Sequence, residues 1–137
     1  MVDGLHCWDK SLETGHEEID SQHKMLVSTY NGFIEALRRG EAADEILKTV
    51  DFLSGYAFMH FEMEEGLQLR TGYPDYVKHK FIHDDFRLTL EGLVQRFREE
   101  GPTEELVDFV TKVVGDRLLI HLKGEDYEMA TYVKSRI

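Results

Sequence analysis

The sequence predicts an all-α protein, an up-down-up-down antiparallel four-helix bundle preceded by an N-terminal arm. Apolar residues recur at steps of three and four positions through four long stretches, which is the period of an amphipathic helix. The period-two alternation that is typical of a half-buried strand is absent. The breaks between the four stretches are short, so consecutive helices are expected to run antiparallel and to pack at shallow angles.

The first helix is predicted over residues 17–39, because Gly40 ends the periodic stretch. Two alternatives remain for its start. Thr14 and Glu17 have the spacing of a capping box, and Asp20 is a competing N-cap. The residues of its inward stripe are Ile19, His23, Leu26, Tyr30, Phe33 and Leu37.

The second and third helices are predicted over residues 43–69 and 75–99. They are separated by a break that contains Gly72 and Pro74, and Pro74 suits the first turn of the following helix. The second stripe consists of Ile46, Val50, Leu53, Ala57, His60, Glu64 and Leu67. The third consists of Tyr76, His79, His83, Phe86, Leu90, Leu93 and Phe97.

The fourth helix is predicted to begin after Gly101 and Pro102, with Thr103 at its start, and to continue toward Lys134. Its inward stripe carries Val107, Val110, Val114, Leu118 and His121. The four helices therefore occupy residues 17–137, and residues 1–16 are left as the N-terminal arm. We expect residues 1–137 to form a single domain.

Length and charge limit the classes of protein to consider. A chain of 137 residues is long enough to bury a substantial core. The net charge of -11 argues against a nucleic-acid partner, which would require a basic surface. No apolar run approaches the length of a membrane span and no signal peptide opens the chain, so we expect a cytoplasmic protein without membrane contact. A single cysteine, Cys7, excludes an intramolecular disulfide.

Two short segments place pairs of metal-binding side chains on apolar helix faces. His60 and Glu64 are four residues apart, and so are His79 and His83. Four residues turn a helix by roughly 400°, so the members of each pair lie one above the other. Ionisable groups that face an apolar seam are costly unless they are paired or bind a metal. The sequence therefore predicts a metal site inside the helical core.

Polar residues interrupt the inward stripes of all four helices at compatible heights. Those in the first and third helices lie early, whereas those in the second and fourth lie late. Because neighbouring helices run in opposite directions, all of these side chains are expected at one end of the bundle. The candidate metal ligands are His23, His60, Glu64, His79, His83, His121 and Asp126.

The number and type of these donors favour two metal ions. Five imidazoles and two carboxylates exceed what one ion can use, and a zinc site requires only three or four ligands. Two six-coordinate ions that share both carboxylates and one bridging oxygen would use these donors and leave one position open for a small exogenous ligand. Imidazole and carboxylate ligation without thiolate suits iron or manganese better than copper.

The same residues carry a resemblance to a known family. Trp8-Asp9 and the segments that contain the seven candidate ligands, including Ile19-Asp20-Ser21-Gln22-His23 and His121-Leu-Lys-Gly-Glu-Asp126, resemble the bacterial branch of the hemerythrins over essentially the whole chain. The resemblance implies a non-haem di-iron centre, with two iron ions (Fe2+/Fe3+) and a bridging oxo or hydroxo group. It also implies reversible O2 binding, for oxygen transport, storage, delivery or sensing, rather than enzymatic activity.

The resemblance further implies a role for each candidate residue. His79, His83 and His121 would hold one iron ion and His23 and His60 the other, and Glu64 and Asp126 would bridge the two. The family places apolar residues of the fourth helix over the open iron position. Leu118 and Leu122, which flank His121, would therefore line the O2 pocket.

Two other functions remain open at this point. In a sensory module of a larger signalling protein, O2 binding or a change of redox state would alter the surface presented to an attached domain. A ferritin-like oxidase or ferroxidase is disfavoured, because that class uses two Glu-x-x-His motifs on helices. The one such motif here is Glu13-Thr-Gly-His16, which lies in the arm.

Several polar residues are expected to lie outside the metal site. His6 and His16 precede the first helix, and we expect them to have a surface or loop role. Cys7 is expected to be an inert thiol rather than a ligand. Glu62 and Glu65 flank Glu64 on other helix faces and are expected to be solvated. Trp8 is expected to anchor the arm on the bundle.

The spacing of His121 and Asp126 predicts a distortion of the fourth helix. Five residues turn a regular helix by roughly 500°, which leaves the two side chains about 140° apart. A π-bulge would insert the extra residue and make both side chains face one centre. We therefore expect a widened turn or another distortion between about residues 118 and 126, eased by Gly124.

Overall fold

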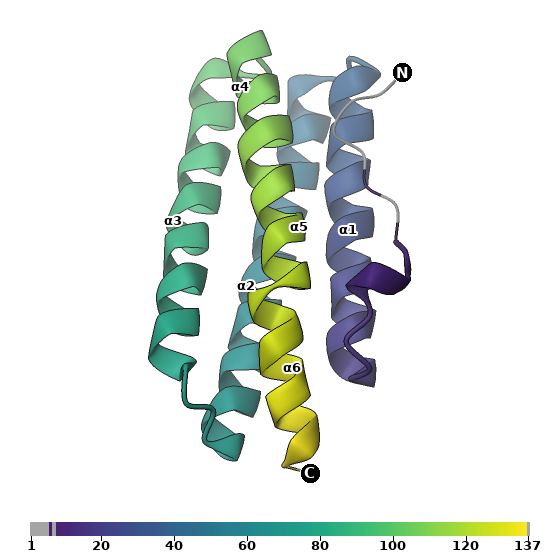
Figure 1. Cartoon of the computed structure of the whole chain (residues 1–137). Helices are drawn as coiled ribbons and strands as arrows, with labels where there is room; N and C mark the ends of the chain where they lie inside the picture. The colour runs from purple at the N-terminus through teal and green to yellow at the C-terminus, as the bar shows by residue number, and fades with distance from the viewer. Residues whose placement is uncertain (1–5, 7, 137) are drawn as a thin grey trace.

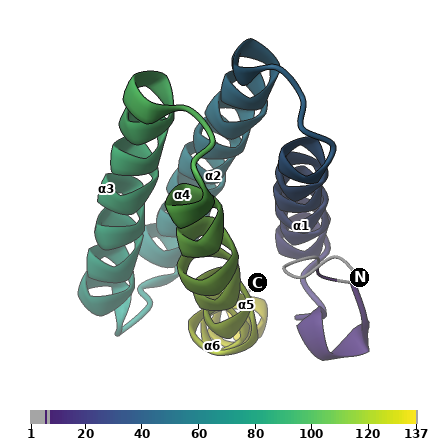
Figure 2. The same cartoon turned by 90° about the horizontal axis from the view of Figure 1, so that it is seen from above.

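Four long helical rods pack side by side in the computed structural model, which describes residue 6 and residues 8–136 (Figure 1). The first three rods are α1 (Glu17–Arg38), α2 (Ala43–Thr71) and α3 (Tyr76–Glu100). The fourth comprises α4 (Glu104–Phe109), the π-helix η2 (Val110–Gly115), α5 (Asp116–Lys123) and α6 (Glu125–Ser135). The described residues include no strand, and the predicted all-α four-helix bundle is confirmed. Figure 2, seen from above, shows the rods at the corners of a square.

The start of α1 differs from both sequence-based alternatives. His16 is the N-cap, and its Nδ1 accepts a hydrogen bond from the Ile19 N–H at 3.3 Å. The Asp20 carboxylate instead accepts bonds from the backbone N–H of Thr14 at 2.8 Å and from the Thr14 hydroxyl at 2.7 Å. Asp20 therefore fixes the arm onto α1 from inside the first turn of the helix.

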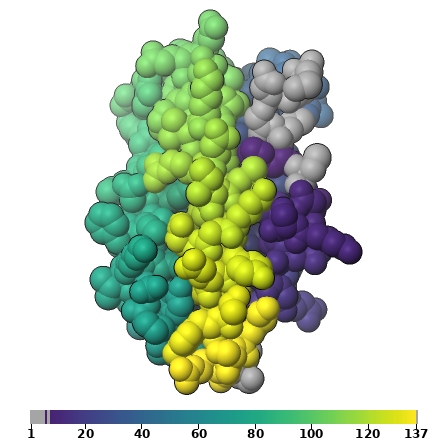
Figure 3. Space-filling model, in the orientation of Figure 1, coloured from purple at the N-terminus to yellow at the C-terminus, as the bar shows by residue number. Residues whose placement is uncertain are grey.

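The described part of the N-terminal arm packs across α1 and the fourth rod. It contains the short 3-10 helix η1 (Lys10–Leu12), and the Leu12 side chain is buried in the core. The backbone N–H and carbonyl of His6 bond the Asn31 side chain at 2.9 and 2.6 Å. Trp8 packs against the core, as expected. Figure 3 shows the arm, in purple, lying against the yellow-green fourth rod.

The apolar interior consists of two separate clusters. The larger fills most of the bundle and includes Leu26, Phe61, Phe86 and Leu118. The smaller, which we call the α6 cluster, consists of Ile19, Met129, Ala130 and Val133. In sequence, His23 falls between Ile19 of the α6 cluster and Leu26 of the larger cluster, and Asp126 falls between Leu122 of the larger cluster and Met129 of the α6 cluster.

The fourth rod departs from regular α-helix twice. Gly124, with φ -100° and ψ -90°, separates α5 from α6. The predicted distortion between residues 118 and 126 is therefore present, but its predicted form is wrong, because one non-helical residue interrupts the helix there instead of a π-bulge. The π turns lie earlier, at Val110–Gly115, where a Cβ on Gly115 would overlap the phenol of Tyr30. This close approach accounts for glycine at the end of the widened turn.

None of the helices in the described part of the chain combines the length and the apolar character that crossing a membrane would require.

Candidate metal centre

The seven candidate ligands converge in one buried layer of the bundle. Each of the seven residues is at most 3% exposed. Their ligand atoms form two groups, and within each group these atoms lie within 4.8 Å of one another. The three-histidine group comprises Glu64, His79, His83, His121 and Asp126, and the two-histidine group comprises His23, His60, Glu64 and Asp126.

In the three-histidine group, one oxygen of each carboxylate faces the imidazoles. Asp126 Oδ1 lies 2.9 Å from Nε2 of His79 and 2.9 Å from Nε2 of His121. Glu64 Oε1 lies 3.3 Å from Nε2 of His83. The Nε2 atoms of His83 and His121 are themselves only 3.2 Å apart. Three imidazole nitrogens and two carboxylate oxygens therefore point at one small volume.

In the two-histidine group, the other oxygen of each carboxylate is used. Asp126 Oδ2 lies 2.9 Å from Nε2 of His23. Glu64 Oε2 lies 3.2 Å from Nε2 of His23 and 3.0 Å from Nε2 of His60. Glu64 and Asp126 thus divide their oxygens between the two groups, which is the arrangement of carboxylates that bridge two metal ions.

The hydrogen-bonding pattern of this layer fits a metal better than a network of mutual hydrogen bonds. Buried polar atoms normally have hydrogen-bond partners. Here Glu64 Oε1, both carboxylate oxygens of Asp126, and Nε2 of His60 and His79 are buried without a bond of acceptable geometry. They lie about 3 Å from neighbouring candidate ligand atoms, but at angles that do not make a hydrogen bond. Imidazole and carboxylate donors without sulfur suit iron.

Three further side chains form hydrogen bonds to Nδ1 of three of the imidazoles. We call Nδ1 the outer nitrogen, because Nε2 is the ring nitrogen that faces the carboxylates of the centre. Glu65 accepts from Nδ1 of His83 at 2.8 Å, and Glu125 accepts from Nδ1 of His121 at 2.8 Å. Nδ1 of His60 bonds the Gln22 side-chain oxygen at 2.7 Å. The expectation that Glu65 is solvated is wrong, because the rotation of α2 turns it toward α3, where it also pairs with Arg87. Glu62 is exposed, as expected.

Without metal, the centre is a cluster of coupled acids and bases. Burial lowers the pKa of His23, but the nearby carboxylates of Asp126 and Glu64 outweigh it and raise the pKa to about 9. The same balance raises the pKa of His79 to about 9. Burial also lowers the pKa of His121, but attraction to the Asp126 carboxylate outweighs it and raises the pKa to about 10. Burial raises the pKa of Glu64 and Asp126, but the imidazoles hold both well below the usual range.

These shifts give the metal-free protein a characteristic pH dependence. The raised histidine pKa values contribute stability that is complete below about pH 6.5 and is lost as the pH rises through about 9 to 10. The lowered carboxylate pKa values contribute stability above about pH 4 that is lost under acid. Urea denaturation of metal-free protein should therefore show lower stability at pH 9.5 than at pH 6. Equal stability at the two values would contradict this balance of charges.

His6 and His16 belong to neither metal group. The ring of His6 stacks on Tyr30 at 5.0 Å, and His16 caps α1. Cys7 lies outside the described residues. Leu118 and Leu122 are buried on either side of His121, and Leu118 lines a small apolar cavity of ≈ 10 Å³ together with Phe61, Phe86 and six other residues.

The fold and the donor set together define a metal-binding four-helix bundle with paired imidazole and carboxylate groups. Residues 14–133 match the hemerythrin HHE cation binding domain, and the chain belongs to the hemerythrin family.

Relatives from distant organisms align over most of the chain. A bacteriohemerythrin of Stenotrophomonas maltophilia is 28% identical over 136 residues, which cover 97% of this chain and 84% of that protein. A myohemerythrin of Theromyzon tessulatum is 27% identical over 121 residues, 88% of each chain. A hemerythrin-like protein of Naegleria gruberi is 31% identical over 119 residues, 87% of this chain and 86% of that protein.

Proposed function

We propose that residues 1–137 form a single domain that holds two iron ions and binds O2 reversibly. The three-histidine group would hold one ion and the two-histidine group the other, with Glu64, Asp126 and an oxo or hydroxo group as bridges. The observation that supports this most directly is that each carboxylate directs one oxygen to each group. The family match and the names of the relatives support iron and O2.

When bound, the iron pair would supply the electrons for O2 binding. The protein's own contribution is to fix the imidazoles and to keep water away from them. The two-histidine group offers one fewer imidazole than its neighbour, so an open position would lie in that half. Leu118 and Leu122 would cover it with apolar surface and protect the bound ligand from stray protons.

A binding role is favoured over an enzymatic one by the composition of the centre. Five imidazoles and two carboxylates would provide little negative charge to stabilise high-valent iron, in contrast to the glutamate-rich ferritin-like sites. We therefore propose a carrier, storage or sensing protein for O2.

Metal analysis combined with absorption spectra under argon, under air and again under argon tests this function. The expected result is two iron ions per chain and visible bands that appear with O2 and disappear when it is removed. One tightly bound zinc ion, or iron that oxidises without a reversible spectral change, would overturn the proposal.

Truncation of the apolar cover is expected to shorten the life of the oxygenated state. Leu118→Ala or Leu122→Ala would admit water or anions to the open position and accelerate autoxidation. Each change also opens a core cavity, at a cost of about 2–5 kcal/mol in folding stability. The rate of loss of the oxygenated spectrum is the measurement, and Leu106→Ala, a buried change in α4 that does not line the cavity beside Leu118, is the control for stability alone. Unchanged autoxidation in both variants would remove these leucines from the pocket.

A further inference from the structure

The two halves of the metal centre differ in what holds the outer nitrogens of their imidazoles. In the three-histidine group, two of these nitrogens bond carboxylates. In the two-histidine group, one bonds a neutral amide, and the other has no partner among the described residues. A second-sphere carboxylate fixes the ring and makes the imidazole a stronger donor to a metal.

On the three-histidine side, both carboxylates are held in place. Glu65 is nearly buried, and its Oε2 accepts from His83 at 2.8 Å and from Arg87 at 2.9 Å. Glu125 follows directly after the break at Gly124 and reaches Nδ1 of His121 at 2.8 Å. The next residue, Asp126, faces the Nε2 of the same ring at 2.9 Å. The break thus lets two consecutive carboxylates face opposite nitrogens of one imidazole.

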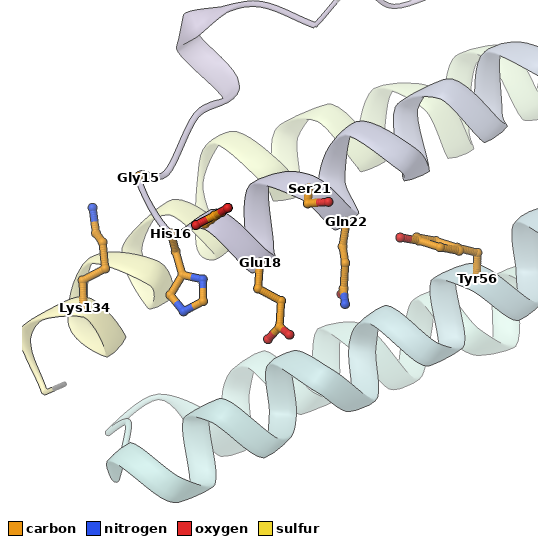
Figure 4. A pocket seen from close by; sticks show the side chains of 8 residues that line it. Gly15, His16, Glu18, Ser21, Gln22, Tyr56 and Lys134 are labelled. Carbon is orange, nitrogen blue, oxygen red and sulfur yellow. The ribbon is translucent and has the colours of Figure 1, made fainter.

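On the two-histidine side, the residue that bonds an outer imidazole nitrogen is neutral and borders solvent. Gln22 bonds His60 at 2.7 Å, and its side chain also lines a surface hollow of ≈ 860 Å³ between α1 and α2. Figure 4 shows Gln22 extending from α1 toward α2 in this hollow, between Glu18 and Tyr56. Nδ1 of His23 is buried without a hydrogen-bond partner in the described part of the chain.

We propose that Glu65 and Glu125 are positioning residues that make the three-histidine group the tighter metal site. The ion held by His23 and His60 is then the last to be bound and the first to be lost. This inference rests on the proposed di-iron function and adds to it an order of loading and a chemical cause for that order. The two-histidine group, whose outer nitrogens bond no carboxylate among the described residues, is also the group with one fewer imidazole.

Chelator challenge of the iron-loaded protein tests the order of release. Wild-type protein is expected to lose its two ions in separate fast and slow phases. His60→Ala, which disables the two-histidine group, should retain one ion whose release matches the slow phase. Glu65→Gln or Glu125→Gln should weaken binding of the slow ion by about 10–100-fold. Gln22→Glu should slow the fast phase, whereas Glu62→Gln, an exposed change beside Glu64, should alter neither phase.

A second readout separates positioning from a purely structural role. Glu65→Gln and Glu125→Gln should shift the reduction potential of the iron pair to more positive values, and Gln22→Glu should shift it to more negative values. A purely structural effect would lower the melting temperature of the metal-free variants and leave the potential unchanged, which would overturn the inference.

The remaining outcomes distinguish this inference from the proposed function. Two ions that leave wild-type protein in one phase, with the same rate in the glutamine variants, would overturn the order of loading and leave the di-iron function intact. A protein that takes up no iron would overturn the di-iron function itself.

Discussion

Metal-free protein is expected to melt about 10 °C or more below the iron-loaded protein. Glu64 and Asp126 are fully buried, and without metal they have only the neighbouring imidazoles to balance their charge. Uncompensated buried charge costs several kcal/mol, and metal binding to a folded site adds directly to folding stability. For a domain of this size, 1 kcal/mol shifts the melting temperature by roughly 3–5 °C. Circular dichroism melts before and after chelation provide the measurement.

The pH dependence of the difference in melting temperature between metal-free and iron-loaded protein is an internal control. At pH 6 protonated imidazoles pair with the two carboxylates, so the metal-free centre is partly compensated. At pH 9.5 the imidazoles with raised pKa values lose protons, and the gap between metal-free and iron-loaded protein should widen. Restoring iron should restore the higher melting temperature. Identical melting curves with and without iron would show that the buried layer does not depend on metal.

Replacement of one histidine in either metal group is expected to reduce the iron content below two per chain. His60→Ala removes one of two imidazoles from its group, and His83→Ala removes one of three. Each change also removes the nitrogen nearest to one Glu64 oxygen. Nε2 of His60 lies 3.0 Å from Oε2, and Nε2 of His83 lies 3.3 Å from Oε1. Iron analysis and the absorption spectrum of each purified variant measure the loss.

The two histidines outside the groups serve as matched controls. His6→Ala removes a ring that stacks on Tyr30, and His16→Ala removes the cap of α1, at a cost of about 1 kcal/mol in stability. Both variants should keep two iron ions and the wild-type spectrum. Loss of an ion in either variant would place a ligand in the arm and contradict the assignment of the centre to the bundle.

The long helices and the convergence of the ligands could be predicted because both depend on spacing along the chain. Apolar steps of three and four define one face of each helix, and His60 with Glu64 or His79 with His83 share that face by the same geometry. Because neighbouring helices run antiparallel, the position of each candidate ligand along its helix determines how far along the bundle it lies. These features require no knowledge of how a helix is rotated against its neighbours.

The supporting residues could not be predicted because they depend on that rotation. Glu65 is one residue beyond a ligand, and whether it reaches water or His83 is decided by the packing of α2 against α3. Gln22 precedes His23 in sequence, yet its side chain bonds Nδ1 of His60 on the neighbouring helix α2. The only available signal was that each lies beside a ligand. The glycine at the end of the π-helix likewise reflects the close approach of Tyr30 to Gly115, which spacing alone does not reveal.

The metal layer also determines how cooperatively the bundle opens. It separates the larger apolar core from the α6 cluster, and α6 has only 11 residues after the break at Gly124. A helix of that length is marginal by itself in water. With ions in place, Asp126 would tie α6 to the candidate ligands on α1, α2 and α3, so this segment would exchange its amide hydrogens only when the whole bundle unfolds. Without them, the segment becomes a separate unit that opens first, and iron uptake would be the step that joins the two parts into one folding unit.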